Sequence, residues 1–341
     1  MARRLTQIDI ARIANVSQAT VSRVLTGDER VDGETRSRVL DLARLHDYTP
    51  DARARSLRNS HTHLIGLVIR RSPGALDDDP FFASLVASII GFLSDTPYHL
   101  CLDVVQTEQT ERAVYEQMLR SRRVDGLLLV EPEGHDERIQ RLQSDRFPCV
   151  IIGNPPGQTG LWSVDNDNMQ AAELACRHLL SEGYDSVGFL GGPAGVAVSE
   201  DRIAGYARAV GAGKRRIWHA EFGHESSYKL ARQVLSSQDR PEALLVLDDF
   251  MAMGVVQAAR DMGIRIPTEL GLASFNDSSL CQLVEGGLTS VNLNIGELVR
   301  TACGRLLQII DEEPGAAPRR QLIESELRVR GSSQRGGAQV R

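Results

Sequence analysis

The segment Val16–Leu25 carries side chains that could read DNA bases. Its apolar residues Val21, Val24 and Leu25 recur at helical spacing and are expected to face inward. The outward face would then present four side chains that are small, polar or cationic: Gln18, Ala19, Ser22 and Arg23. Arg can bind guanine with two hydrogen bonds, Gln can bind adenine, and an Ala methyl can contact a thymine methyl. Such a face suits the major groove of double-stranded DNA, although three-helix domains with an arginine face also bind proteins.

A second arginine-rich segment spans residues 51–58 and contains the single leucine Leu57 between Arg55 and Arg58. An apolar side chain flanked by arginines is what a minor-groove wedge requires, because the cations follow phosphates while the leucine partly unstacks a base step. At two turns the segment is too short to be a stable helix alone. The alternative is an ordinary linker in which Leu57 packs against the rest of the protein.

Polar residues also follow several apolar runs in the second half of the chain. Asp248 follows Leu244–Leu247, Asn276 follows Leu270–Phe275, and Arg202 opens a helix after the turn at residues 191–193. If these runs are parallel strands, their carboxyl ends border one cleft, which is where open α/β folds bind ligands. A carboxylate, an amide and an arginine there suit hydrogen bonds to neighbouring hydroxyl groups.

Three phenylalanines could complete that cleft. Phe222 offers an apolar face for a sugar ring or a base, while Phe81 and Phe82 could close the cleft from the first half of the chain. Each polar candidate also has a structural interpretation. Asp249 could cap the helix that follows it, Arg202 could be an internal ion-pair partner, and Phe81 and Phe82 could belong to the core.

The elements that must position these residues fall into two classes. Residues 5–46 read as three short helices. From Leu64 onward, short apolar runs alternate with helical segments, which predicts parallel sheets covered by helices on both faces. The predicted strands are 64–69, 98–105, 126–130, 149–152, 187–190, 244–247 and 270–275. The predicted helices are 81–95, 109–121, 168–182, 199–211, 225–236, 250–262 and 296–312.

About 270 residues in this pattern should form two α/β layers rather than one. The boundary is expected near Gly153–Trp162, where prolines and glycines interrupt the pattern. A strand near 321–329 is expected to return to the first layer, and the tail from Gly331 is expected to be disordered.

Charge and composition favour a polyanion-binding module on an acidic body. The 341 residues carry a net charge of −6, yet the first 60 hold 11 arginines against 8 acidic residues.

No apolar run reaches about 18 residues, so no membrane span is expected. The five cysteines are scattered without a C-x-x-C pair, which favours reduced thiols over disulfides or a zinc site. Without an apolar leader at the N-terminus, the expected location is the cytoplasm.

The order of these motifs resembles the LacI/GalR (lactose/galactose repressor) family. The N-terminal matches are Ile8–Ala11, Val16–Ser17, Ala19–Leu25, Glu34–Arg36, Tyr48-x-Pro50 and Ala54–Arg58. The later matches are Ile65–Gly66, Val124–Leu127, Gly191–Pro193, Arg202 with Gly205–Tyr206, Asp249 with Met251–Gly254, Ile266–Pro267 and Leu288–Val291. The resemblance covers about residues 5–330.

The resemblance implies an all-α helix-turn-helix head, a hinge helix and a two-lobed body like that of periplasmic sugar-binding proteins. The corresponding domains are residues 1–49, 50–62 and 63–341, with a first lobe of 63–160 plus 291–330 and a second lobe of 161–290. It implies a homodimer on a pseudo-palindromic DNA operator, controlled by a small-molecule effector. The DNA contacts would be Ser17, Gln18, Ala19, Thr20, Ser22, Arg23, Arg55, Leu57 and Arg58, and the effector contacts Phe81, Phe82, Arg202, Phe222, Asp248 and Asn276.

Several positions depart from the family pattern, among them Val196 and Val198, which replace hydroxyl-bearing residues of some relatives. Asn276 stands where the family frequently has an acidic residue, and Gly153 stands where it often has Asp. With fewer carboxylates than a typical hexose site, the cleft admits a nucleoside or another small metabolite besides a sugar. The sequence therefore predicts a ligand-controlled transcriptional repressor with no metal or cofactor.

Two other functional classes compete with this prediction. An enzyme on a doubly wound fold is disfavoured, because the glycine-rich Gly191–Gly195 is neither G-x-G-x-x-G nor a Walker loop, and no G-x-S-x-G elbow or metal-spaced His/Glu set is present. A transport binding protein would share the two-lobed body, but the basic N-terminal segment argues against it.

Overall fold

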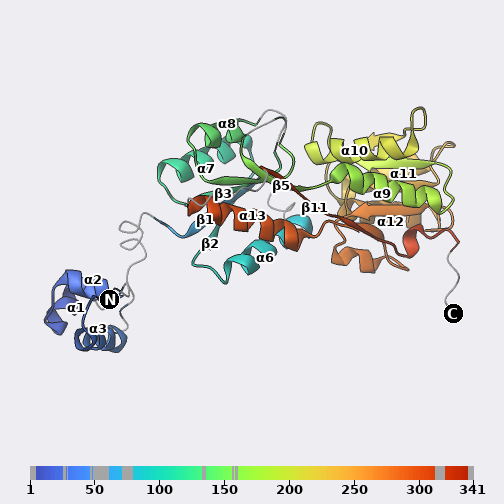
Figure 1. Cartoon of the computed structure of the whole chain (residues 1–341). Coiled ribbons are helices and arrows are strands. Elements are labelled where there is room, and N and C mark those ends of the chain that lie inside the picture. Colours follow the sequence, from blue (N-terminus) through green and yellow to red (C-terminus); the bar gives the residue numbers. More distant parts are fainter. Residues whose placement is uncertain are drawn as a thin grey trace. The chain divides into compact units, whose positions relative to one another are not determined.

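The protein divides into two compact units, Met1–Thr62 and His63–Arg341, in this computed structural model (Figure 1). The structure describes residues 5–25, 28, 30–46, 48, 61–70, 80–132, 136–155, 157, 160–311 and 319–336. The predicted hinge helix at 50–62 lies outside these residues except for its last two positions.

The described residues of the first unit form three helices, α1 (Gln7–Ala14), α2 (Gln18–Leu25) and α3 (Gly33–Leu45). They enclose a small core built around Ile10, Val21 and Val39. The side chains of Thr6 and Asp9 form a reciprocal capping box at the start of α1, which satisfies backbone donors that the helix itself leaves free. Asn15 takes a left-handed conformation with φ 53°, so the chain turns directly from α1 toward α2.

The second unit contains two six-stranded sheets. The first sheet has the strand order β11-β5-β4-β3-β1-β2, and all its strands are parallel. Its strands are β1 (Leu64–Arg70), β2 (His99–Val105), β3 (Gly126–Val130), β4 (Cys149–Ile152), β5 (Trp162–Asn166) and β11 (Arg320–Ile323). Helices α6 (Pro80–Leu93) and α13 (Ile295–Ile310) cover one face, and α7 (Glu108–Arg120) and α8 (Glu137–Ser144) cover the other (Figure 1).

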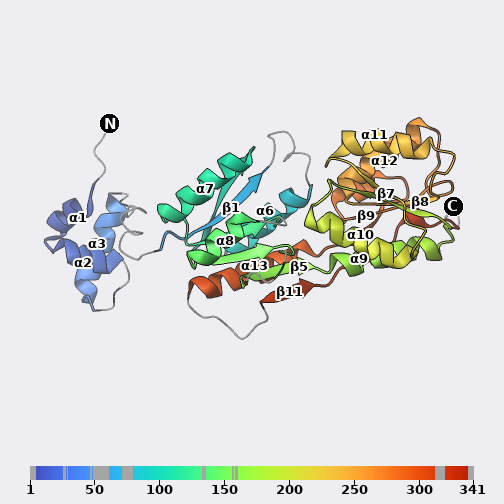
Figure 2. The ribbon, with the colours of Figure 1, turned by 90° about the horizontal axis from the view of Figure 1, so that it is seen from above.

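The second sheet has the order β12-β10-β9-β8-β6-β7 and is parallel except for the antiparallel edge pair β10–β12. Its strands are β6 (Val187–Gly191), β7 (Ile217–His219), β8 (Ala243–Val246), β9 (Gly271–Phe275), β10 (Thr289–Asn292) and β12 (Glu326–Arg328). Helices α9 (Asn168–Ser181) and α10 (Ala197–Val210) lie on one side of this sheet, and α11 (His224–Leu235) and α12 (Asp249–Asp261) lie on the other (Figure 2). The predicted fold class, a helical head and two parallel-sheet lobes, is confirmed.

The predicted lobe boundary at residue 160 is wrong by one strand. β5 pairs with β4 and β11, so it belongs to the first lobe, and the second lobe begins with α9. The predicted strand 321–329 is in fact two strands, because β11 completes the first sheet and β12 joins the second. The chain therefore crosses between the lobes three times, after β5, after β10 and after β11.

One buried amide connects these three crossings. Asn166 ends β5, and its Nδ2 donates to the carbonyl oxygens of Leu293 at 2.8 Å and Ile323 at 3.1 Å. Those two carbonyls lie on the second and third crossings. The Asn166 side chain thus connects all three segments that join the two lobes.

The tail from Gly331, expected to be disordered, is ordered as far as the structure describes it, to residue 336. Ser332 is fully buried against the second sheet. Its Oγ donates to the carbonyl of Leu272 at 2.7 Å and accepts from the backbone N–H of Thr289 at 2.8 Å. Arg335 forms an ion pair with Glu242 at 2.6 Å. The polar composition of the tail gave no sign of this docking, because the Ser332 hydroxyl binds backbone groups of β9 and β10.

Candidate functional site

Helix α2 presents the residues expected to read bases. Gln18, Ala19 and Arg23 are exposed on the first unit, and Thr20 is half-buried. Ser17 precedes the helix, where its Oγ accepts from the backbone N–H of Thr20 at 3.0 Å. This cap fixes the first turn of α2. The arrangement leaves an amide, a methyl group and a guanidinium available on one helix surface.

Ser22 is placed differently from its prediction. It was expected to face outward, but it is only 5% exposed. At about 100° per residue it lies beside Val21, at the edge of the apolar face rather than opposite to it. Ser22 therefore does not share the exposed surface of Arg23. Arg55, Leu57 and Arg58 lie outside the described residues, and their role in the minor groove stays a prediction.

A cavity of about 590 Å³ lies between the two sheets of the second unit. Strand ends and loops of both lobes border it, as expected for the carboxyl ends of parallel strands. The six residues predicted to contact an effector all line it: Phe81, Phe82, Arg202, Phe222, Asp248 and Asn276. The structure thus brings together residues that are up to 195 positions apart in the chain, while their contact with an effector stays a prediction.

Arg202 is the most constrained cation of the cavity. It belongs to α10 and is 4% exposed. Its Nε donates to Asn168 Oδ1 at 3.0 Å, its Nη1 donates to the carbonyl of Leu247 at 2.5 Å, and its guanidinium lies 4.2 Å from the centroid of the Phe275 ring. Burial lowers the pKa of Arg202 to about 10, although nearby carboxylates oppose the shift, led by Asp248. The guanidinium therefore remains charged at neutral pH in a fixed orientation.

Asp165 and Asn168 continue this polar chain, and the sequence did not predict either residue. Asn168 Nδ2 lies 3.3 Å from both carboxylate oxygens of Asp165, so this one amide joins Asp165 to Arg202. Burial raises the pKa of Asp165 to about 6, against the opposing hydrogen bond from the Asn166 backbone and the charge of Arg202. Both residues flank the end of β5, a strand that has no continuous apolar run to signal it.

The two adjacent aspartates after β8 have separate roles. Asp248 lines the cavity and caps α12, with its Oδ1 accepting from the backbone N–H of Met251 at 2.6 Å. Asp249 is buried behind it, where it accepts hydrogen bonds from Ser274 at 2.5 Å and Ser290 at 2.7 Å. The capping role that the sequence suggested for Asp249 thus belongs to Asp248, and Asp249 connects strands within the second lobe.

The backbone conformation at Gly153 disfavours any side chain at the position directly after β4. Its φ is 125°, a conformation that side chains rarely adopt, and an added Cβ would lie 2.8 Å from Cδ of Pro132. The next residue, Asn154, donates from Nδ2 to Asp201 Oδ2 of α10 at 2.9 Å. This hydrogen bond joins the two lobes at the edge of the cavity.

Comparison with known proteins identifies the family. Residues 6–51 match the family model described as bacterial regulatory proteins, lacI family, and residues 176–333 match a periplasmic binding protein-like domain. The HTH-type transcriptional regulator MalR of Streptococcus pneumoniae is 30% identical over 311 residues, which cover 89% of this chain and 92% of that protein. The chain belongs to the LacI family.

Other transcriptional regulators resemble the chain over similar lengths. The HTH-type transcriptional repressor PurR of Klebsiella pneumoniae is 30% identical, with 89% of each chain covered. The solved complex of the regulator CelR with cellobiose is 25% identical with a TM-score of 0.73, and covers 96% of this chain and all of that one. The Lac repressor dimer bound to operator, 23% identical, has a TM-score of 0.86 over 97% of this chain and 99% of that one, which supports the same fold.

The described residues contain neither a membrane-spanning helix nor a metal-binding cluster. No described helix has the length and apolar character that crossing a membrane requires. Within the same residues, no cluster of three or more His, Cys, Asp or Glu side chains is placed to hold a metal ion.

Proposed function

We propose that this LacI-family DNA-binding regulator is a homodimeric repressor whose affinity for a pseudo-palindromic operator is set by a small molecule bound between its lobes. The observation that carries the proposal is the cavity of about 590 Å³ with the fixed guanidinium of Arg202 in its wall. Such a volume fits a small metabolite. Operator binding also requires access to the chromosome, so the proposed location is the bacterial cytoplasm.

The DNA half of the proposal rests on the surface of α2. Gln18, Ala19 and Arg23 are the proposed base contacts, and Ser17 and Thr20 are the proposed contacts at the start of the helix. Arg55, Leu57 and Arg58 are proposed to bind the minor groove on the evidence of their sequence alone. Because a pseudo-palindrome presents two half-sites, two copies of the chain would bind it about a two-fold axis.

The chemistry of the cavity supports a sugar or a nucleoside as the effector. Phe81, Phe82 and Phe222 offer apolar faces, while Asp248, Asn276 and Arg202 offer hydrogen-bonding groups. The similar regulator CelR forms a complex with cellobiose, which is a sugar. Because MalR and PurR are regulators, we propose that the cavity binds its ligand without turning it over.

The proposed mechanism of control is a shift in lobe closure. An effector that contacts both lobes stabilises the closure in which those contacts are made, and it shifts the equilibrium only by its differential affinity for the two states. The crossings held by Asn166 would transmit the closure to the first lobe, and so to the segment that leads to the DNA-binding head. Paired hinge segments that order only on the operator would then respond to small changes in spacing.

The test is operator binding by the purified full chain. The DNA would be selected from the upstream region of the gene, and anisotropy would be measured with a panel of sugars, sugar acids, sugar phosphates, nucleosides and nucleotides. One compound that changes operator affinity would support the proposal and give the effector class. Absence of any preference for a selected duplex over random DNA would contradict the DNA half, and an operator affinity that no metabolite changes would contradict the effector half.

A further inference from the structure

Arg70 lines two separate hollows of the first lobe. It is the last residue of β1 and belongs to the wall of the effector cavity. It also borders a groove of about 390 Å³ between α7 and α8, on the side of the sheet away from α6 and α13. Its side chain is 35% exposed. A single guanidinium therefore lies at the border between the effector cavity and a charged groove.

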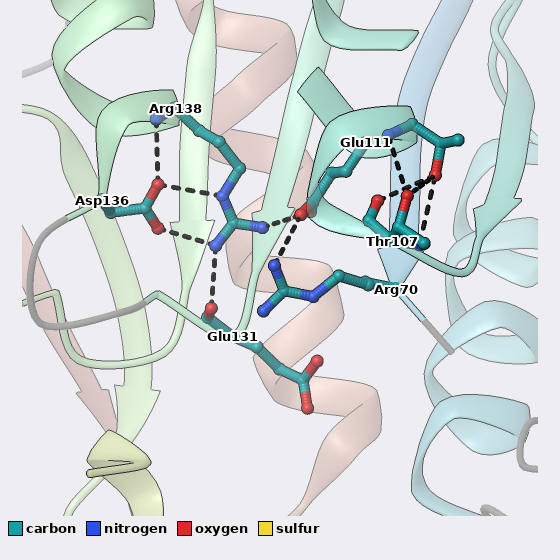
Figure 3. Close-up of polar contacts among 7 residues, drawn as sticks. Arg70, Thr107, Glu111, Glu131, Asp136 and Arg138 are labelled. Carbon is teal, nitrogen blue, oxygen red and sulfur yellow. Dashed lines mark hydrogen bonds and ion pairs between the residues drawn. The ribbon is translucent and has the colours of Figure 1, made fainter. Parts of the chain in front are cut away.

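A buried ion network holds Arg70 from the groove side (Figure 3). Glu111 of α7, with a side chain only 3% exposed, accepts from Arg138 Nη1 at 2.6 Å and from Arg70 Nη1 at 3.3 Å. Arg138 is in turn bound by both carboxylate oxygens of Asp136 and by the backbone carbonyl of Glu131. Figure 3 shows the Glu131 side chain directed away from Arg138.

Arg70 is the more exposed of the two arginines that Glu111 binds. Arg138 is 14% exposed and makes four hydrogen bonds within the network, whereas Arg70 contacts Glu111 at a longer distance and is more exposed. An anion in the cavity would therefore compete with Glu111 for Arg70, while Arg138 would continue to neutralise Glu111.

We propose that Arg70 determines effector specificity, by binding an anionic oxygen group, a carboxylate or a phosphate, at the first-lobe end of the cavity. Glu111 is the positioning residue that holds the guanidinium in place when no anion is bound. The rest of the effector lies toward Asp248, Asn276 and Arg202 of the second lobe. This inference rests on the proposed function, and it narrows the effector to an acidic sugar, a sugar phosphate or a nucleotide.

The second-lobe charges are compatible with this placement. Asp248 of the second lobe is engaged as the cap of α12, while Glu131 and Asp165, both of the first lobe, also line the cavity. Arg202 contributes a second cation from the opposite lobe. An effector with hydroxyl groups at one end and an acidic group at the other thus meets hydrogen-bonding side chains in the second lobe and Arg70 in the first.

The experiment compares matched neutral and acidic compounds on the full chain by calorimetry and thermal shift. The sets are glucose, gluconate and glucose 6-phosphate; ribose and ribose 5-phosphate; and adenosine and its monophosphate, with inorganic phosphate alone as the minimal probe. We expect the acidic member of at least one set to bind roughly 10- to 100-fold tighter, as charge-assisted hydrogen bonds would give. Comparison of gluconate with the phosphate compounds shows whether the cavity binds a carboxylate or a phosphate.

Three variants test the residues. Arg70→Gln should abolish the preference for the acidic member, and Arg70→Lys should retain part of it because the charge stays. Glu111→Gln should increase affinity for the acidic member several-fold and leave the neutral member unchanged, because an uncharged amide holds Arg70 less tightly. A purely structural role of Glu111 would instead change both affinities together. Arg112→Gln is the matched control, since Arg112 borders the groove and pairs with Glu137 but lies outside the cavity lining.

Two results would overturn the inference. One is a parent protein without preference for any acidic member, including one that no compound of the panel binds. The other is an Arg70→Gln variant that folds normally and keeps the preference. Operator binding measured on the same samples separates these outcomes from failure of the proposed function, because a protein that binds its operator and responds only to neutral compounds remains a ligand-controlled repressor.

Discussion

At the scale of single residues, two arginines of the head allow recognition of DNA bases to be tested separately from binding of DNA phosphates. Arg23 lies on the exposed surface of α2, whereas Arg12 is exposed on α1. We expect Arg23→Ala to weaken operator binding by about 1–3 kcal/mol and to relax the preference at one base pair. Arg12→Ala should weaken binding to all duplexes equally and lower the salt dependence. Fluorescence anisotropy would measure the binding of both protein variants to the operator and to operators with single-base changes, at several salt concentrations. An equal loss of selectivity in the two protein variants would contradict the assignment.

Asp165 gives a residue-scale prediction that depends on pH. Its folded pKa of about 6 lies above the ordinary value of 3.8, so the folded protein binds more protons than the unfolded chain between those values. Asp165 therefore costs stability as pH rises from about 4 to 6, and the full cost remains above pH 6. We expect Asp165→Asn to raise the free energy of unfolding by up to about 2 kcal/mol at pH 7.5 and by little near pH 4. Urea unfolding at both pH values tests this, and a gain independent of pH would refute it.

At the scale of elements, the three crossings between the lobes depend on Asn166. Replacing it with Leu removes the donor that two carbonyls share, which we expect to cost about 1–3 kcal/mol. Asn166→Asp should be worse at neutral pH, because a carboxylate would face both carbonyls, and should recover part of the loss in acid as the carboxyl gains a proton. Unfolding curves at pH 4 and 7 would measure the stability of the two variants. An Asn166→Asp variant that is more stable than Asn166→Leu at pH 7 would contradict the proposed contact.

Most helices and most strands could be predicted because their signal is local, although no helix was predicted where α8 lies. The helices predicted at 168–182, 225–236 and 250–262 are observed within one residue at each end, since apolar spacing and capping residues lie within each segment. β5 was missed because Trp162–Asn166 alternates polar and apolar residues and becomes a strand only through pairing with β4 and β11. The residues that end it, Asp165 and Asn166, were missed with it.

At the scale of the whole molecule, the hydrogen bond from Asn154 to Asp201 is a direct link between the lobes beside the cavity. We expect Asn154→Ala to shift the effector-free protein toward an open arrangement and to lower effector affinity about 2- to 10-fold, in keeping with one lost hydrogen bond. Small-angle scattering and calorimetry would measure both effects. Gln140→Ala, an exposed position of α8 in the same lobe, is the control, and an unchanged scattering profile in Asn154→Ala would refute the link.

The sequence by itself determined the two-part architecture, the amphipathic helix α2 and the six side chains that meet at the cavity, because apolar period and turn residues are properties of neighbouring positions. Only the tertiary structure decided the burial of Ser22, the docking of the tail through Ser332 and the chain of contacts from Arg202 to Asp165. It also decided that Arg70 borders both the cavity and the Glu111 network. These depend on groups that meet from distant segments, so no local pattern of residues could encode them.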